Sequence, residues 1–529
     1  MEKTLKLSIV LPEQQLSQHS IDFIHWCHTN PQIELVCFIW TTSKYKSLKN
    51  FIEHWIWKKI LFIERLKLKI KRLTKNDLVS QKKSLGVIQI FDLATKNKEV
   101  IKQIQDLEID LHICLSEDIN PESLKDYSRL GVLCVQGKSS NNLDKKPYFF
   151  EEILNAENKT TFNIICLEPN KRNPILLMQG SFVTHGYFLA NQENIFLRQN
   201  FYIQKVLQDL ILKEIETTEV QKNIGINNQA LAPSISYQAK YVLYLVSLII
   251  QRSFAFFKSE DVWNVGIYMG DWKTLDFQKS YVIPNPHNHF LADPFVMSVA
   301  NKNYCFVEDY DVKKSKGAIA VYELGQECAE MVGIALEESF HLSYPYLFQY
   351  DSKIYMLPES GDNNDIRLYE ASEFPLGWKL IRIIKRDVLA VDSMIFEHEG
   401  RWWLFSNINP IGDRDVCSEL SIFYSDNPIN GDWLPHEKNP VIFDPSSARN
   451  GGIILEESSI YRVGQNQRFG TYGGGGFSVN KIIDLRPGGY QEESVLKVEP
   501  NFFEDIKGSH HFHSNGVISA FDFLSQKNS

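Results

Sequence analysis

Short apolar segments alternate with polar turns throughout residues 262–529, and five of these segments begin in a similar way. The five passages are His289–Val296, Leu342–Phe348, Ala390–Phe396, Arg449–Ile454 and Gly508–Phe512. Each places a polar or small residue just before an apolar run, and in the first four a turn and an aromatic run follow. The passages recur about every 50 to 60 residues, which is the length of a propeller blade. Since one four-stranded blade cannot bury its own faces, the pattern predicts an all-β, five-bladed β-propeller.

Two further segments of this half have their own predictions. The apolar run Trp263–Met269 is expected to be a strand that completes the last blade, so that the ring closes by pairing its two ends. The glycine-rich run Tyr472–Phe477 is followed by no Lys and opens no helix, so it does not fit a phosphate loop. It is interpreted as a strand edge where glycines allow close backbone approach.

The first 220 residues alternate strand-like and helix-like segments. Strands are expected at 5–11, 33–40, 87–91, 111–115, 132–135 and 162–167, and a helix at 14–30. This rhythm is typical of βαβ units and predicts a mostly parallel, Rossmann-like sheet. Because 529 residues exceed one core, the chain is expected to be multidomain. The predicted parts are an α/β domain at 1–220, a linker and apolar helix at 221–261, and the propeller at 262–529.

Two segments outside the predicted sheets combine apolar and basic residues. Residues 51–73 interleave Lys and Arg with Trp, Phe, Ile and Leu. This pattern is interpreted first as a surface helix with a solvated basic face, and a helix lying on an anionic membrane surface is the alternative. Residues 237–257 form an apolar helix candidate that is too short to span a bilayer. It is expected to pack between the two domains, with membrane contact as the alternative.

Charge and cysteine content narrow the classes of function. The net charge is -9, which argues against a general nucleic-acid binder. The eight cysteines are scattered without a CxxC pair, as expected of reduced thiols. The first residues lack a signal-peptide layout, so a cytoplasmic location is expected.

Polar residues recur at equivalent places in the predicted blades. They are Asp293, His341, Glu359, Asp392, Arg449, Asn450 and His510. Inner strands of a propeller point their ends at one mouth of the channel, so these side chains are expected to converge there. An Asp before Pro or Ser can also simply start a turn, but recurrence in phase with the blades favours convergence.

The first domain resembles the formyltransferase fold. The resemblance lies in the strand order, in Leu130–Gly137 and in Lys146–Glu151. The active family has a His after the glycine-containing strand and an Asp further on. Here Gln136 stands near the place of the His, and Lys171–Leu176 occupies the region of the Asp. The resemblance therefore implies the fold without the general acid/base of the activity.

The second domain resembles the propeller at the N-terminus of glucosamine inositolphosphorylceramide transferases, itself similar to five-bladed glycoside hydrolases of family 43 type. The motifs are Ala292–Phe295, Phe306–Glu308, His341–Pro345, Met356–Glu359, Asp392–Ser393, Trp402–Phe405, Ala448–Gly452, Tyr461–Gln465 and Gly508–His510. The resemblance implies that Asp293 is the general base and that Asp392 adjusts and orients a neighbouring catalytic group. The family places its acid Glu on a later blade, where Glu456 and Glu457 stand. Glu359 and Glu308 end inner-type strands and are preferred as the further catalytic carboxyls.

The predicted substrate-binding set consists of polar groups around this mouth. It comprises His341, Tyr344, Asn407, Arg449, Asn450, Arg462, Gln465 and His510. Arg449, Arg462 and His341 are suited to a phosphate or a sugar carboxylate, or else to pairing with the acidic residues. The resemblance implies that His510 helps to hold a central metal ion; the residues alone leave this open, and no other cofactor is expected.

The leading hypothesis is a glycosyltransferase of cell-surface polysaccharide or glycolipid biosynthesis. It would use a nucleotide-sugar donor and a glycan or lipid-linked acceptor, on the inner membrane face if residues 51–73 bind lipid. A glycoside hydrolase of the same propeller type is the first alternative, and a non-catalytic glycan-binding or scaffold protein is the second. The sequence leaves the sugar, the stereochemical outcome and the oligomeric state open.

Overall fold

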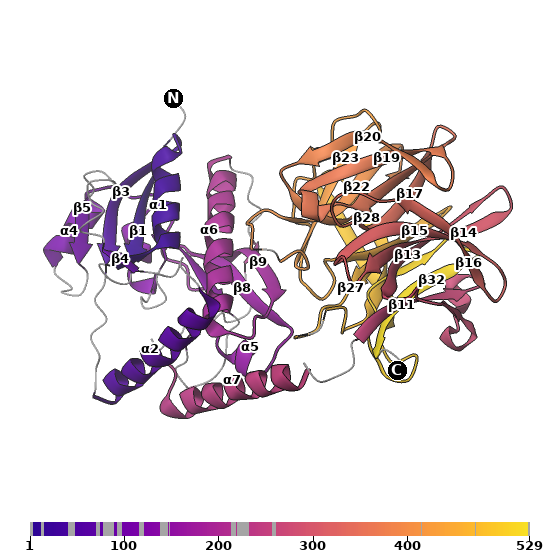
Figure 1. The fold of residues 1–529 in the computed structure, drawn as a ribbon. Coiled ribbons are helices and arrows are strands. Elements are labelled where there is room, and N and C mark those ends of the chain that lie inside the picture. The colour runs from indigo at the N-terminus through magenta and orange to yellow at the C-terminus, as the bar shows by residue number, and fades with distance from the viewer. Residues whose placement is uncertain are drawn as a thin grey trace. The chain divides into compact units, whose positions relative to one another are not determined.

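The computed structural model separates into two compact units (Figure 1). It describes residues 4–11, 15–40, 48–69, 75–77, 89–92, 98–115, 121–137, 147, 149–212, 218–219, 232–255, 261–413, 415–470 and 472–526. The first unit comprises Met1–Gly180 and Thr184–Ala255, and the second Ser181–Val183 and Phe256–Ser529. Most of the predicted linker lies outside the described residues, and the apolar helix that follows it belongs to the first unit.

The first unit is built on one eight-stranded sheet. Its strands are β1 Leu5–Leu11, β3 Ile33–Trp40, β5 Gln89–Asp92, β6 Leu111–Cys114, β7 Val132–Gly137, β8 Lys159–Leu167, β9 Ile175–Val183 and β10 Thr218–Glu219, in the order β10-β9-β8-β7-β6-β1-β3-β5. The pairs β5–β3, β3–β1, β1–β6 and β6–β7 are parallel, whereas β8 runs antiparallel to β7 and β10 to β9. The sheet is therefore mixed: its strands from β7 to the edge strand β5 are parallel, and the antiparallel pairs lie towards the other edge. The formyltransferase-type assignment of this unit stays a prediction.

Some helices of this unit contact the sheet and others pack on neighbouring helices. The described α-helices are α1 Gln18–Thr29, α2 Leu48–Leu68, α4 Lys98–Gln105, α5 Glu151–Leu154, α6 Phe188–Leu212 and α7 Ile235–Ala255; β2 Gln15–Ser17 pairs with β4 Lys75–Asp77. Ser17 caps α1, since its Oγ accepts from the Ser20 amide at 3.2 Å. The basic helix expected at 51–73 is α2, with residues 70–73 outside the described part. Among the described helices, none is long and apolar enough to cross a membrane.

The second unit consists of five blades of antiparallel strands that follow one another along the chain, and the last two blades form one nine-stranded sheet through a parallel pairing between their inner strands. The first is β13 His289–Val299, β14 Lys302–Asp311, β15 Lys316–Leu324 and β16 Ala329–Leu336; the second is β17 Ser343–Tyr350, β18 Lys353–Glu359, β19 Asp365–Glu373 and β20 Gly377–Arg386. The third is β21 Leu389–His398, β22 Arg401–Asn409, β23 Glu419–Ser425 and β24 Leu434–Pro435, with β25 Ile442–Phe443 also on β23. The fourth is β26 Asn450–Glu456, β27 Ser459–Gln465, β28 Phe477–Arg486 and β29 Gly489–Val498.

The fifth blade joins the two ends of the second unit. It contains β31 Phe512–Ser514, β32 Ser519–Gln526, β11 Asp261–Tyr268 and β12 Tyr281–Ile283, with β30 Ile506–Gly508 on β32. Strand β11 pairs with β32 from Asp261↔Gln526 to Tyr268↔Ser519. The predicted closing strand at 263–269 is therefore confirmed, and the ring is held shut by backbone hydrogen bonds between distant parts of the chain.

The innermost strands β13, β17, β21, β26 and β31 contact one another in succession, and β31 returns to β13. This closed order makes the unit a five-bladed ring (Figure 1). Aromatic side chains fill the space between blades: Phe295 of β13 meets Tyr346 of β17 edge-on at 5.6 Å, and Phe348 meets Trp402 at 6.0 Å. Such contacts bury the apolar faces that a single blade would leave in water.

Candidate functional site

A two-residue bulge recurs in the inner strands of the ring. The pairing of β13, β17, β21 and β26 with the next strand skips residues 293–294, 344–345, 392–393 and 451–452. Asp293, Tyr344 and Asp392 take φ of 50°, 45° and 49°, a region that costs a non-glycine residue about 1–3 kcal/mol. The fourth blade instead uses glycines, with Gly452 at φ 126°. The bulges interrupt the side-chain alternation and bring the two Asp residues into contact with neighbouring blades.

Asp293 joins the first blade to the last. Its Oδ1 lies 3.2 Å from Nε2 of His510, and the other ring nitrogen of His510 lies 3.0 Å from Oδ2 of Asp522. Asp522 also accepts the backbone amides of His510 and His511 at 2.9 and 3.0 Å. Asp293 Oδ2 accepts the Tyr344 amide at 3.3 Å. The result is a buried Asp–His–Asp chain in which one imidazole lies between two carboxylates.

Burial and charge fix the protonation of this chain. Burial raises the pKa of Asp293, but the hydrogen bond and charge of His510, aided by His511 and Arg449, bring it down to about 2. Burial lowers the pKa of His510, but Asp522 and Asp293 raise it to about 10. At neutral pH Asp293 is therefore a carboxylate held against an imidazolium.

The pKa values of Glu308 and Glu359 are shifted in the opposite direction. Burial, followed by the charges of Asp293 and Glu359, raises the pKa of Glu308 well above its ordinary value. Burial and the charge of Asp392 raise the pKa of Glu359 in the same direction, against the opposing effect of Arg449. The cluster thus places carboxyl groups whose pKa values are shifted in opposite directions beside one another, which is the division that acid/base chemistry needs.

Asp392 binds Arg449 of the next blade. Arg449 Nε lies 2.6 Å and its Nη2 3.5 Å from the two carboxylate oxygens, and Gln465 Nε2 donates to the same carboxylate at 3.2 Å. Arg449 Nη2 also lies 3.8 Å from Glu359 Oε2. The guanidinium therefore links Asp392 to Glu359 across the second, third and fourth blades, and its outer face is covered by the ring of Tyr472 at 4.9 Å.

His341 lies at the more exposed side of the cluster, with 23% of its side chain accessible. Its Nδ1 accepts the Gly317 amide at 2.8 Å, so the proton of the neutral ring is on Nε2, which lies 3.6 Å from Glu308 Oε1. Burial lowers the pKa of His341, in keeping with a neutral ring. The structure thus brings together Asp293, Glu308, Glu359, Asp392 and His341 as the repeat pattern predicted.

Four other residues of the predicted substrate-binding set are fully buried. Asn407, Asn450, Arg462 and Gln465 are each 0% exposed. Arg462 forms a two-pronged pair with Glu492 at 2.8 and 2.6 Å and also donates to the carbonyl of Ser447. Asn407 bonds the backbone of Glu419, Ala448 and Asn450. These contacts hold the inner strands in place, and contact of these residues with substrate stays a prediction.

Glu456 lies at the far end of β26 from Asn450. It accepts Trp272 Nε1 at 3.0 Å and pairs with Lys273 at 2.6 Å. Glu359 and Glu308 were preferred to Glu456 and Glu457 as catalytic carboxyls. The position of Glu456, at the end of β26 opposite Asn450, agrees with that preference.

Three residues beside the cluster were not predicted from the sequence. Asp522 binds His510, and the rings of Trp263 and Tyr472 lie 4.2 and 5.1 Å from the ring of His510. Tyr472 is held by the glycine-rich run: a side chain at Gly473 would come within 3.1 Å of His510, and one at Gly476 would collide with the Val498 carbonyl. The close backbone approach expected of these glycines is confirmed, but residues 472–475 form a turn and not the strand edge that was expected, and β28 begins only at Phe477. Tyr472 is 41% exposed, so it covers the cluster on the solvent side.

The donors Asp293, His510 and Asp522 lie within 4.8 Å of one another, close enough for a metal ion. However, the distances from His510 are hydrogen-bond lengths, and a pKa of about 10 keeps both ring nitrogens protonated. A protonated ring nitrogen has no lone pair for a metal. As placed, the three groups hold a proton that a metal ion would have to displace, and the metal ion implied for His510 stays a prediction.

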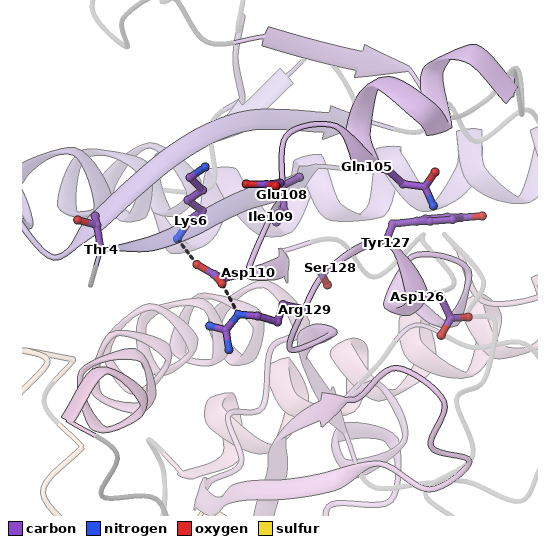
Figure 2. Close-up of a pocket in the computed structure, with 10 residues that line it drawn as sticks. All are labelled: Thr4, Lys6, Gln105, Glu108, Ile109, Asp110, Asp126, Tyr127, Ser128 and Arg129. Carbon is purple, nitrogen blue, oxygen red and sulfur yellow. Dashed lines mark hydrogen bonds and ion pairs between the residues drawn. The ribbon is translucent and has the colours of Figure 1, made fainter. Parts of the chain in front are cut away.

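The first unit has a separate cavity of about 540 Å³, drawn in Figure 2. It lies where β1, β6 and β7 begin, whereas ligands of open α/β sheets bind beyond the carboxyl ends of the strands. The carboxylate of Asp110 is occupied by the Lys6 amide at 2.9 Å and by Arg129 Nε at 2.5 Å (Figure 2). This arrangement ties the starts of these three strands together.

Comparison with known proteins matches the propeller. Residues 279–518 match the family described as glucosamine inositolphosphorylceramide transferase 1, N-terminal. The proteins of that name from Arabidopsis thaliana and Oryza sativa subsp. japonica are 35% and 39% identical over 265 and 191 residues, which is 45% and 35% of this chain. The matches cover 34% and 25% of those relatives, so this chain spans about a third or less of their length. The predicted resemblance of the propeller to this family is confirmed.

Solved structures similar to this chain include two α-L-arabinofuranosidases. The catalytic domain from Coprinopsis cinerea is 11% identical, with a TM-score of 0.33, covering 51% of this chain and 99% of that domain. The enzyme from Lactobacillus brevis is 14% identical, with a TM-score of 0.31, covering 44% of this chain and 81% of that enzyme.

Proposed function

We propose that this protein is a glycosyltransferase of cell-surface polysaccharide or glycolipid biosynthesis, with its active site at the carboxylate cluster of the propeller. The feature that carries the proposal is a buried cluster of carboxyl groups whose pKa values are shifted in opposite directions. Asp293 is ionised, with a pKa lowered to about 2, while the pKa values of Glu308 and Glu359 are raised well above normal. The relatives with matching propellers bear the name of a glucosamine transferase, which supports sugar transfer as the reaction class.

In the proposed reaction a hydroxyl of the acceptor attacks the anomeric carbon of a nucleotide-sugar. The new bond joins the acceptor oxygen to that carbon, the bond from carbon to the phosphate oxygen breaks, and the phosphate leaves with the electron pair. Asp293 takes the proton of the hydroxyl. Neutral Glu359 donates a hydrogen bond to the departing oxygen, and Arg449 beside it balances the charge of the diphosphate. The rings of Tyr472 and Trp263 offer an apolar surface for a sugar ring.

A second candidate function is glycan binding without turnover, and one observation favours it. Between two thirds and three quarters of each relative's length lies outside the match, so the transferase chemistry of the relatives can reside in that remainder. In that case the acidic cluster would recognise sugar hydroxyls, since carboxylates accept them readily.

The test is an assay of the full chain with a panel of nucleotide-sugars, beginning with nucleotide-linked glucosamine, and with inositol-containing phospholipid or membrane extract as acceptor. The transferase proposal predicts nucleotide release that depends on the acceptor. Free sugar released from glycans without any nucleotide donor would indicate a hydrolase instead. Glycan binding measured by calorimetry, with neither product formed, would indicate the second candidate.

A further inference from the structure

Helices α2 and α7 of the first unit pack against each other through one face of each. Trp57 is 2% exposed, and its ring meets that of Tyr241 edge-on at 5.6 Å. The Tyr241 hydroxyl donates to Glu64 Oε2 at 2.9 Å, and Glu64 Oε1 accepts the Leu189 amide at the start of α6 at 2.6 Å. Gln238 Nε2 donates to the Glu53 carbonyl at 2.8 Å. These contacts fix the rotation of both helices, so their outward faces are defined.

Those outward faces are apolar. The exposed apolar side chains are Ile52, Trp55, Phe62, Ile63 and Leu66 on α2, and Val242, Leu243, Val246 and Ile250 on α7. Ile63 and Leu243 are 68% and 69% exposed. The spacing of three, four and seven residues places them in one stripe along each helix. Both helices run along the same edge of the first unit (Figure 1), and soluble proteins rarely leave apolar stripes of this length in water.

The exposed charges among these apolar residues are basic. Lys58 and Lys59 are exposed between Trp55 and Phe62, and Lys240 is exposed on α7. The acidic residues of the two helices are Glu53, which is half-buried, and Glu64, which is 3% exposed. The whole chain has a net charge of -9, so the charge of this surface is opposite in sign to the net charge of the protein.

We propose that this paired surface of α2 and α7, termed the lipid face, binds an anionic lipid bilayer with both helices lying in the interfacial plane. Apolar side chains that enter the acyl boundary, flanked by lysines that meet anionic head groups, are the features of interfacial helices. A second copy of this chain fits less well, since a two-fold contact would bring the lysines of both copies together. The proposal concerns the first unit and does not depend on the chemistry of the propeller.

The test is co-sedimentation of the full chain with vesicles of phosphatidylcholine mixed with phosphatidylglycerol, and with vesicles of phosphatidylcholine alone. The double variant Trp55→Glu, Leu243→Glu is expected to bind both kinds of vesicle at least about tenfold more weakly, since each large apolar side chain contributes about tenfold or more when buried. Lys58→Glu with Lys59→Glu is expected to weaken binding to the anionic vesicles at least about fivefold and to leave the neutral vesicles unaffected. The matched control is Val517→Glu, an apolar residue of the propeller with 64% exposure, which is expected to bind as wild type.

Wild-type protein that stays in the supernatant with anionic vesicles would overturn the proposal. A second outcome would also overturn the proposal. In it, sedimentation velocity shows that wild type is a dimer, and the double variant Trp55→Glu, Leu243→Glu is a monomer that binds lipid as well as wild type does. A further measurement avoids dependence on a charged substitution. Brominated lipids are expected to quench part of the wild-type tryptophan fluorescence, and Trp55→Phe is expected to remove that quenched part; quenching unchanged in Trp55→Phe would contradict the proposed depth of the helix.

Discussion

The imidazole of His510 lies 3.2 Å from the carboxylate of Asp293, although the two residues belong to the last and first blades of the ring. The contact therefore exists only when the ring is closed by the pairing of β11 with β32. Since Asp522 lies on β32 itself, ring closure also supplies the carboxylate on the other side of the imidazole. Stability and the charge state of the cluster are consequently linked.

The first prediction concerns the pH dependence of stability. The folded pKa of His510 is raised from 6.5 to about 10, so its contribution is fully present below pH 6.5 and is lost as the pH rises through about 10. The folded pKa of Asp293 is lowered from 3.8 to about 2, so its contribution is present above pH 3.8 and is lost as the pH falls towards 2. Urea denaturation across this range should show a maximum between about pH 4 and 6.5.

The same prediction has a variant that isolates its alkaline part. His510→Gln removes the titrating ring and leaves two buried carboxylates without a cation, which should lower the free energy of unfolding by about 3–5 kcal/mol near pH 6. The decline of stability between pH 6.5 and 10 should be smaller in this variant than in wild type. An equally steep decline in both proteins would show that another group titrates.

The second prediction concerns the pair of Asp392 and Arg449. Asp392 is 2% exposed on its side chain, so Arg449→Met leaves a buried charge unpaired and should lower the free energy of unfolding by about 3–5 kcal/mol. The double variant Asp392→Asn, Arg449→Met should lose less than the sum of the two single variants, because the charge is removed with its partner. A double-mutant cycle by urea denaturation measures this coupling, and additive losses would contradict it.

The propeller could be predicted because each repeat has its own local pattern of polar and apolar residues. Each blade begins with a polar residue before an apolar strand, and Asp293, Tyr344 and Asp392 recur at the same structural place, the positive-φ bulge. The convergence of Glu308, Glu359 and His341 could be predicted because these residues stand at places set by the same blade repeat. The strand at 263–268 was recognised by its apolar pattern and by the need of a ring to close.

The parts that could not be predicted depend on contacts between distant residues. Asp522 stands in an ordinary alternating strand, and nothing local marks it as the partner of His510 until β32 pairs with β11. Tyr472 reaches Arg449 because a glycine-rich turn folds back over the cluster, which the sequence indicated only as close backbone approach. Conversely, Arg462 looked available for substrate, because its partner Glu492 lies 30 residues away on another strand.

The third prediction tests ring closure. A side chain at Gly266 of β11 would come within 2.4 Å of the ring of Phe521 on β32. Gly266→Ala should therefore lower the free energy of unfolding by about 1–3 kcal/mol through overpacking. In a Phe521→Leu background the effect of Gly266→Ala should be smaller, because the aromatic ring that the new methyl group would contact is absent. Thermal unfolding of the four proteins checks this, and an unchanged effect in the Leu background would place the strain elsewhere.

The fourth prediction concerns metal ions at the Asp293–His510–Asp522 chain. Because a protonated imidazole already occupies the space between the carboxylates, a chelator should change neither the melting temperature nor ligand binding. Added calcium or zinc should likewise leave the melting temperature unchanged at pH 7. A rise in melting temperature with either ion, abolished by His510→Gln, would show that the ion displaces the proton.

The decisive experiment for an active site in the propeller compares acceptor-dependent nucleotide release by wild type, Asp293→Asn and Asp484→Asn. Asp484 is an acidic residue of the same propeller that pairs with Arg486 outside the cluster. Asp293→Asn is expected to lose at least about a hundredfold in rate, because a general base is removed, and to keep its fold intact by circular dichroism. Asp484→Asn should retain wild-type activity. Transfer by a folded Asp293→Asn protein at the wild-type rate would contradict the assignment of the active site to the propeller.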